Sequence, residues 1–300
     1  MDFLAAIIWD LDPEIVTILG RPIRWYGPLF ASGFFFGIYI AQAMFKKEGI
    51  PEDWLEKGFL FMLGGTILGA RLGHVFFYDW PYYSQHLWEI PMIWQGGLAS
   101  HGALLGITLA LYLYSRYVTK RSIIWISDRV VVPVALGAAL IRLGNFTNSE
   151  IVGKLADPEL PWSVIFALRT DLENPPLPRH PVQLYEAFAY LLIFAFLMFL
   201  YWRTQARNRR GELVGWFMTL VFSARFIMEY FKTSQGGFES SLASVAELST
   251  GQWLSIPCVL LGMGFLYFAY TKGVNPWPPV EVKVKKENRA ERKRKARKKS

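Results

Sequence analysis

The sequence predicts an all-α polytopic membrane protein with seven transmembrane helices and a small periplasmic cap. The 300 residues are 53% apolar and have a mean hydropathy of +0.24. The apolar residues gather in runs of roughly 20, the length that crosses a bilayer, rather than in the pattern of a soluble core. The connections between the runs alternate in positive charge, which assigns them to opposite sides of a membrane.

Seven ranges are long and apolar enough to be expected as membrane spans. His101 and the glycines beside it interrupt the third, which is therefore the weakest of the set by composition. The expected ranges are 25–44, 58–78, 98–115, 123–142, 184–202, 213–231 and 252–271.

The distribution of Lys and Arg orients these spans. The connections 45–57, 116–122 and 203–212 carry basic residues, as does the chain after 272, whereas 79–97 and 233–251 carry none. Basic connections remain on the cytoplasmic side. We therefore expect a periplasmic N-terminus, a cytoplasmic C-terminus and an odd number of spans.

The two terminal segments differ in charge. Residues 1–24 lack the basic start of a cleavable signal peptide, and we interpret them as a periplasmic arm. The net charge of the chain is +8, and residues 272–300 alone hold 12 Lys or Arg against 3 Glu. A basic segment after a last span is typical of a disordered cytoplasmic tail beside anionic headgroups, and we do not expect nucleic acid as a partner. The transmembrane domain is expected over 25–271.

The longest connection, at about 146–183, is expected to form the periplasmic cap. Its prolines exclude a long helix, and residues 162–168 are expected to include a short strand. The cap should cover the region of Arg142.

The twelve residues from Arg142 to Gly153 are the most informative stretch. Arg142 ends an apolar run, where its charge needs an anionic partner, and a guanidinium suits a phosphodiester. Asn145, Asn148 and Glu150 can bond carbonyl and hydroxyl groups, and Gly153 allows a close approach of the backbone. The pattern predicts a site for a polar-headed lipid. The alternative is a helix end with an arginine that reaches the interface and asparagine caps.

Other polar residues stand within or beside the apolar ranges. His101 can accept a proton near neutral pH, although a single histidine there can also be structural. Arg71 and Arg225 come from separate spans and are expected to converge with Arg142 on one anion. Glu229 lies four residues after Arg225, so an internal ion pair is the alternative for that couple. Tyr26 marks the outer interface, where tyrosine is common.

Several chemistries have no support in the sequence. There is no phosphate-binding glycine loop, no metal-binding histidine pair, no dinucleotide fingerprint and no serine nucleophile motif. The single cysteine, Cys258, excludes an intrachain disulfide. No metal or organic cofactor is expected. If the protein is an enzyme, its nucleophile is expected to arrive with the substrate.

The chain resembles the prolipoprotein diacylglyceryl transferases of bacterial inner membranes. The resemblance rests on seven stretches that occur in the family's order between residues 24 and 257. They are Arg24–Gly27, Ala70–Gly73, His101–Gly106, Arg142–Gly153, Arg179–Glu186, Arg225–Glu229 and Gly251–Pro257.

This resemblance implies a multi-pass enzyme of the inner membrane that uses phosphatidylglycerol among the membrane lipids. It implies transfer of the diacylglyceryl group to the lipobox cysteine in the signal peptide of a preprolipoprotein. Carried over by position, it implies phosphate contacts at Arg142 and Arg225, with His101 as the third catalytic residue. It implies essential roles for Tyr26, Asn145 and Gly153 as well, with Glu150 and Glu229 as supports. Together with Arg71 and Asn148, which the residue pattern itself favours, these form the expected substrate-binding set.

The chain departs from the family pattern at three positions. Ala103 and Ile141 each replace a frequent glycine, and Val221 stands where many members have tyrosine. The last difference removes a hydroxyl group from the inferred site. A transporter or flippase of an anionic lipid, or a receptor without catalysis, remains the alternative from residues alone, and a turnover assay separates them.

The charge pattern makes a topology prediction. Reporter fusions after Lys120 and after Arg210 should report a cytoplasmic location, and fusions near Ser84 and Ala243 a periplasmic one. Opposite results at two of the four positions would contradict seven spans with this orientation.

Overall fold

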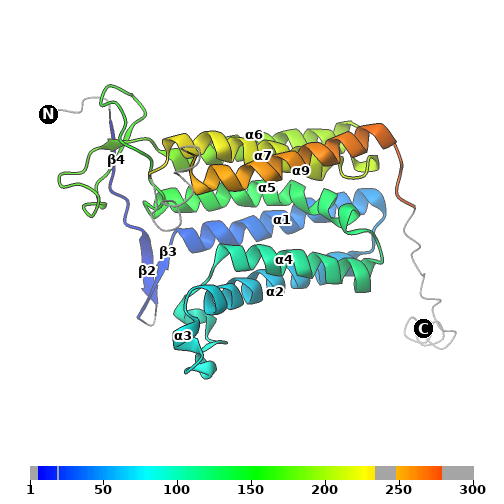
Figure 1. Ribbon diagram of the computed structural model, residues 1–300, viewed down its shortest axis with the longest axis horizontal. Coiled ribbons are helices and arrows are strands. Elements are labelled where there is room, and N and C mark those ends of the chain that lie inside the picture. Colours follow the sequence, from blue (N-terminus) through cyan, green and yellow to red (C-terminus); the bar gives the residue numbers. More distant parts are fainter. Residues whose placement is uncertain (1–5, 19, 234–247, 279–300) are drawn as a thin grey trace, which may run out of the picture.

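The fold is a bundle of long helices with small β-elements at one end. We describe it from a computed structural model of the chain, for residues 6–18, 20–233 and 248–278. The long helices lie roughly side by side (Figure 1). They are α1 (Tyr26–Glu48), α2 (Glu52–Phe77), α4 (Ser100–Leu113), α5 (Ile123–Thr147), α6 (Val182–Arg203), α7 (Glu212–Met228) and α9 (Thr250–Lys272).

The polytopic membrane fold is confirmed, and six of these described helices are long and apolar enough to cross a bilayer. The exception is α4, the weakest of the expected spans. It has 14 residues and continues as a π-helical segment, Tyr114–Thr119. The end of this span that leads to the basic 116–122 connection is thus helical but irregular.

The ends of the helices follow local sequence. Pro181 precedes the first residue of α6, as a helix start at Val182 requires. The side chain of Ser249 caps α9 in a reciprocal arrangement with Gln252. Helix α5 extends to Thr147, beyond its expected range, so the stretch from Arg142 begins inside the helix rather than after it.

Helices α2 and α4 form a closely packed pair through glycines. Gly65, Gly69 and Gly73 of α2 face Gly102 and Gly106 of α4 at backbone distance. A Cβ atom placed on Gly106 would lie 2.1 Å from the carbonyl oxygen of Gly65. Small residues at four-residue spacing allow helices in a membrane to approach in this way. The glycines around His101 therefore have a packing role.

The strands lie at the end of the bundle opposite the basic connections. β1 (Ile7–Trp9) pairs with β4 (Val164–Phe166), and β4 pairs with β5 (Pro178–Arg179). β2 (Glu14–Ile18) and β3 (Arg21–Arg24) form a hairpin. The strand expected within 162–168 is confirmed as β4. The N-terminal arm and the long connection thus share one sheet.

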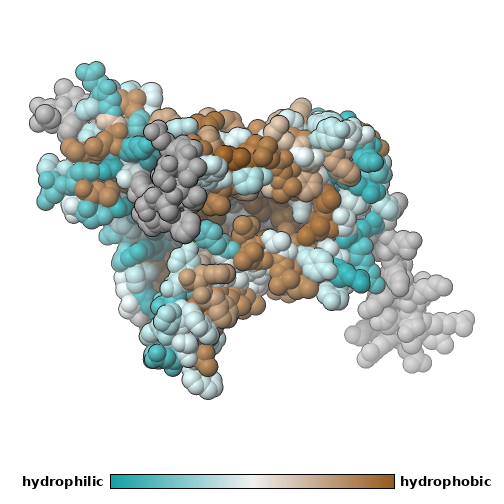
Figure 2. Space-filling model, in the orientation of Figure 1, coloured by the Kyte–Doolittle hydropathy of each residue, from teal (hydrophilic) through white to brown (hydrophobic). Residues whose placement is uncertain are grey.

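The same end carries the 78–99 connection, which includes the short helices α3 (Trp80–Tyr83), Leu87–Glu89 and Ile93–Gln95. In the space-filling view, hydrophobic residues cover much of the flank of the bundle, and hydrophilic residues gather towards its ends (Figure 2). This distribution is the one a membrane-spanning bundle requires.

The basic end is held by buried polar contacts between helices. Arg129 of α5 forms an ion pair with Glu48 of α1, and the Tyr201 hydroxyl of α6 donates to the same carboxylate at 2.5 Å. Asp128 accepts from the backbone amides of Gly211 and Val214 at the start of α7. Buried charges of this kind are stable only when paired, so they fix the relative positions of α1, α5, α6 and α7.

The glycine contact predicts a large effect of one methyl group. Gly106→Ala should lower the free energy of unfolding by about 1–3 kcal/mol, the usual cost of overpacking, because the new Cβ meets the backbone of Gly65. Thermal unfolding of the protein in detergent measures this. Gly264→Ala in α9 is the matched control, since a Cβ there meets nothing within 4 Å. Equal melting temperatures for both variants would contradict the close pairing.

Candidate functional site

The Arg142–Gly153 stretch folds around the carboxylate of Glu150. Asn145 and Asn148 donate to that carboxylate from their side-chain amides at 2.9 and 3.0 Å. Gln183 of α6 donates to the Glu150 carbonyl oxygen at 2.6 Å. The sequence-predicted residues Asn145, Asn148 and Glu150 are therefore brought together as one hydrogen-bonded group.

The backbone of this turn is unusual on both sides of Glu150. Ser149 and Ile151 each have a φ of 53°, in the left-handed region. For a β-branched residue this conformation is an outlier that surrounding contacts must enforce. The bond from Gln183 and the bond from the Glu150 amide to the Asn145 carbonyl, at 2.8 Å, are contacts of this kind.

Arg142 lies between the turn and α6. One guanidinium nitrogen is 3.3 Å from the Asn145 side-chain oxygen, and Nε is 2.9 Å from a carboxylate oxygen of Glu186. Glu186 is fully buried, and its other oxygen is 2.9 Å from Nζ of Lys232. A buried carboxylate thus joins two cations that come from different parts of the chain.

Arg225 of α7 faces the same region without a carboxylate partner. Within the described part of the chain it forms no ion pair, and its Nε is buried with no hydrogen-bond partner. The Tyr190 hydroxyl lies within electrostatic range of both Arg225 and Arg142. Glu229, which the sequence offered as a partner for Arg225, pairs instead with Lys232 at 3.3 Å. Arg225 is therefore a cation with an unsatisfied donor.

Tyr26 also joins this group. It is the first residue of α1, and a Cβ on Gly144 would lie 2.8 Å from its ring. Its hydroxyl is within electrostatic range of Glu150 and Arg142. The close packing on Gly144 brings α1 against the last turns of α5.

The sequence predicted that the backbone of Gly153 approaches a ligand closely, whereas the close approach in the structure is to the protein itself. A Cβ there would lie 2.3 Å from the carbonyl oxygen of His180, so the contact that requires glycine is one within the protein. Arg179 donates to the Gly153 carbonyl oxygen at 2.7 Å. Burial lowers the pKa of His180 below its usual value, so this histidine is neutral at pH 7 and adds no charge to the site.

His101 lies apart from this cluster. It is exposed near the start of α4, and its Nδ1 is 3.4 Å from the Tyr78 hydroxyl. It makes no hydrogen bond with Arg142 or Arg225 among the contacts of the described residues. The pair α2 and α4 carries His101, whereas α5 and α7 carry the arginines.

Arg71 is used differently from the expectation of a shared anion. It is buried, and its guanidinium donates to the backbone carbonyls of Glu89, Ile90 and Gly96 at 2.6, 2.7 and 2.8 Å. It also lies over the ring of Tyr83, 4.9 Å from the centroid. These contacts fasten the 78–99 connection to α2, close to the start of α4.

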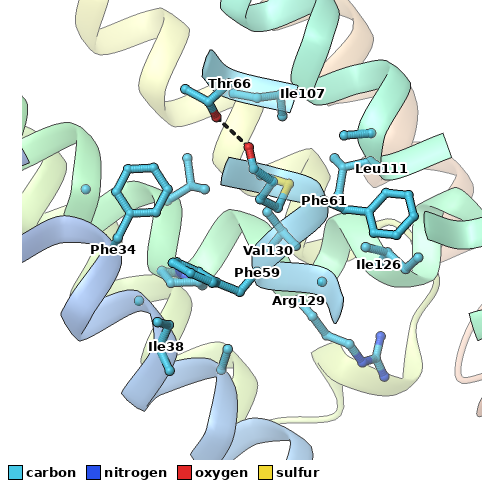
Figure 3. A pocket seen from close by; sticks show the side chains of 18 of the residues that line it. Phe34, Ile38, Phe59, Phe61, Thr66, Ile107, Leu111, Ile126, Arg129 and Val130 are labelled. Atoms are coloured by element: carbon cyan, nitrogen blue, oxygen red, sulfur yellow. Dashed lines mark hydrogen bonds between the residues drawn. The ribbon is translucent and has the colours of Figure 1, made fainter. Parts of the chain in front are cut away.

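An apolar cavity of about 310 Å³ lies between α1, α2, α4 and α5. Phe34, Phe59 and Phe61 are among the side chains around it, and Arg129 is the charged residue of its lining (Figure 3). Ile141, the residue before Arg142, lines it too. So does Phe30, whose ring is stacked with Tyr26 at 6.1 Å. The cavity therefore reaches the polar cluster.

Two functional candidates were missed from sequence. Glu186 belongs to a recognised stretch, but its position gave no sign of a role. Lys232 lies just beyond the Arg225–Glu229 stretch, and its spacing of three residues from Glu229 was the available signal for an ion pair.

Fold and site together define a polytopic membrane protein with a cluster of buried ionic side chains next to an apolar cavity. The family model for prolipoprotein diacylglyceryl transferases matches residues 13–268. The chain belongs to this family and is a diacylglyceryl transferase.

Curated relatives that bear the name phosphatidylglycerol–prolipoprotein diacylglyceryl transferase match the chain over nearly their whole length. The protein of Chloroherpeton thalassium is 48% identical over 267 residues, which cover 89% of this chain and 96% of the relative. The protein of Porphyromonas gingivalis is 46% identical, and the match covers 88% of this chain and 94% of that relative. The protein of Tolumonas auensis is 44% identical, and the match covers 86% of this chain and 95% of that relative.

Proposed function

We propose that this protein transfers the diacylglyceryl group of phosphatidylglycerol to the lipobox cysteine of preprolipoproteins, the first step of bacterial lipoprotein maturation. The observations that carry the proposal are that Arg142 and Arg225 both lie within electrostatic range of Tyr190, with the Arg225 Nε left unpaired among the described residues, and that Ile141, next to Arg142, lines an apolar cavity. An anionic headgroup would complete that donor. The names of the relatives give the same two substrates.

The geometry supports one placement of the lipid. The phosphodiester lies between Arg142 and Arg225, and acyl chains follow the cavity past Phe30 and Ile141. The Glu150 cluster and Tyr26 border the headgroup and select its glycerol hydroxyls. The proposed substrate-binding set is Tyr26, Arg71, Arg142, Asn145, Asn148, Glu150, Gly153, Arg225 and Glu229, in which Arg71 acts through the 78–99 connection.

The proposed reaction is a displacement at the glycerol carbon that bears the phosphate. The cysteine thiolate forms a carbon–sulfur bond, the carbon–oxygen bond breaks, and its electron pair leaves on the phosphate of glycerol phosphate. Arg142 and Arg225 stabilise this developing charge, because preorganised donors in a dry site act strongly on it. His101 accepts the thiol proton. A lipid and a signal peptide both reach such a site laterally from the membrane.

In this proposal the bundle crosses the inner membrane seven times, with α4 and its π-helical continuation as the third span. The sheet of β1, β4 and β5 and the 78–99 connection lie on the periplasmic side, where the lipobox cysteine is presented. The basic end is cytoplasmic. The described part of the tail ends at residue 278, so residues 279–300, expected as a disordered anchor, lie outside the described residues.

A turnover assay tests the function. Purified protein, phosphatidylglycerol and a lipobox peptide should yield the thioether peptide and glycerol phosphate, detected by mass spectrometry. A peptide with Ser in place of the lipobox Cys is the control and should remain unmodified. Movement of the lipid across a vesicle membrane without product would replace the proposal by a transporter.

Arg142→Lys should lose most of its transferase activity although the substitution keeps the positive charge. A lysine cannot contact Glu186, Asn145 and a phosphate from one planar group. We expect a loss of roughly 2–4 kcal/mol in transition-state stabilisation, by analogy with removal of an oxyanion donor. The measurement is kcat/KM in the turnover assay beside a melting curve. Normal turnover of Arg142→Lys would show that the planar guanidinium group is not required.

His101→Gln should lower the rate at neutral pH by roughly 10²–10⁴, the range for loss of a general base. The loss should shrink towards pH 9, because a free thiol with a pKa of about 8.5 then ionises unaided. Binding of phosphatidylglycerol should change little. A loss that is equal at every pH, together with a lower melting temperature, would make His101 a structural residue.

A further inference from the structure

Lys232 is a buried cation to which the proposed reaction assigns no role. Its side chain is 9% exposed, and its Nζ lies 2.9 Å from Glu186 and 3.3 Å from Glu229. Glu186 is also the partner of Arg142. Lys232 is thus one carboxylate away from a proposed phosphate ligand.

The charges of the cluster balance in the absence of substrate. Arg142, Arg225 and Lys232 supply three positive charges. Three carboxylates, those of Glu150, Glu186 and Glu229, oppose them. Two of these, Glu186 and Glu229, contact Lys232, whereas Glu150 is bound by neutral amides. An ammonium group has three donors, so these two contacts leave one free for a further acceptor.

The reaction changes the charge that the site must hold. The bound phosphodiester carries one negative charge, and the attacking thiolate carries another at the sulfur. When the carbon–sulfur bond forms and the carbon–oxygen bond breaks, both charges reside on the phosphate of glycerol phosphate. Two cations match the substrate and the thiolate, but a dianion concentrated on one phosphate favours a third cation near it.

We propose that Lys232 is this third cation, a catalytic residue that contacts the departing phosphate of glycerol phosphate. The inference rests on the proposed function and deepens it. Glu186 binds Arg142 through one oxygen and Lys232 through the other, so the ammonium group of Lys232 is held close to a proposed phosphate ligand. A lysine suits this task because its flexible stem lets a point charge follow the phosphate as it leaves.

The competing interpretation is that Lys232 only neutralises Glu186. A buried carboxylate requires a counter-charge, and this need alone would explain both ion pairs. The two interpretations differ in what the lysine does to the product. A neutralising lysine affects stability, whereas a phosphate ligand affects kcat and the affinity for glycerol phosphate.

The test compares Lys232→Met and Lys232→Arg in the full-length protein in detergent. For Lys232→Met we expect kcat to fall by roughly 10²–10³, as for loss of an oxyanion donor. The inhibition constant of added glycerol phosphate should rise at least tenfold by the same loss of a charge-assisted contact, and KM for phosphatidylglycerol should change by less than about threefold. Lys232→Arg should keep kcat within about tenfold of the unmodified protein. Lys154→Met is the matched control, because Lys154 lies nearby but is exposed.

A double variant keeps the test decisive if Lys232→Met unfolds. Glu186→Gln with Lys232→Met removes both buried charges and should fold. Compared with Glu186→Gln alone, it should still show the weaker inhibition by glycerol phosphate and a kcat at least about tenfold lower. Equal values for these two proteins, or unchanged kcat in a folded Lys232→Met, would overturn the role of Lys232. Absence of thioether product from the unmodified protein would instead overturn the proposed function.

Discussion

The buried carboxylate of Glu186 is the constraint on which the site depends. A charge inside a membrane bundle is stable only with a partner, and Glu186 has two, from α5 and from the segment after α7. It therefore determines where the guanidinium of Arg142 lies relative to Lys232. Arg142 in turn contacts Asn145, which binds Glu150. One ion-paired carboxylate thus connects the helices to the turn around Glu150.

The two ends of the bundle use buried charge for different purposes. At the basic end, Arg129 forms an ion pair with Glu48 and donates to the carbonyl oxygen of Trp125. These contacts are all within the protein, and the ion pair joins α5 to α1. At the other end, Arg225 leaves a buried donor without an acceptor among the described residues. An unpaired buried donor costs free energy that a ligand can recover. This difference separates the structural cluster from the cluster proposed to bind the lipid.

The sequence predicted the membrane bundle well, because runs of apolar residues report directly on the length of a span. The strand within 162–168 also followed from local signals. The contacts of Arg71 could not be predicted from local sequence, because its carbonyl partners come from a connection whose path depends on tertiary packing. Lys232 was missed for the same reason: the carboxylate that defines its position lies 46 residues earlier, on α6.

The pairing of α2 with α4 has a consequence for the setting in which the protein works. These helices pack on each other through glycine backbone, have few contacts with α1 and α5, and carry His101, whereas Arg142 and Arg225 belong to α5 and α7. The proposed proton acceptor and the proposed phosphate ligands thus stand on two groups of helices, with an apolar cavity between α1, α2, α4 and α5. A change in the spacing of these two groups of helices would change the distance between the proposed base and the proposed phosphate ligands.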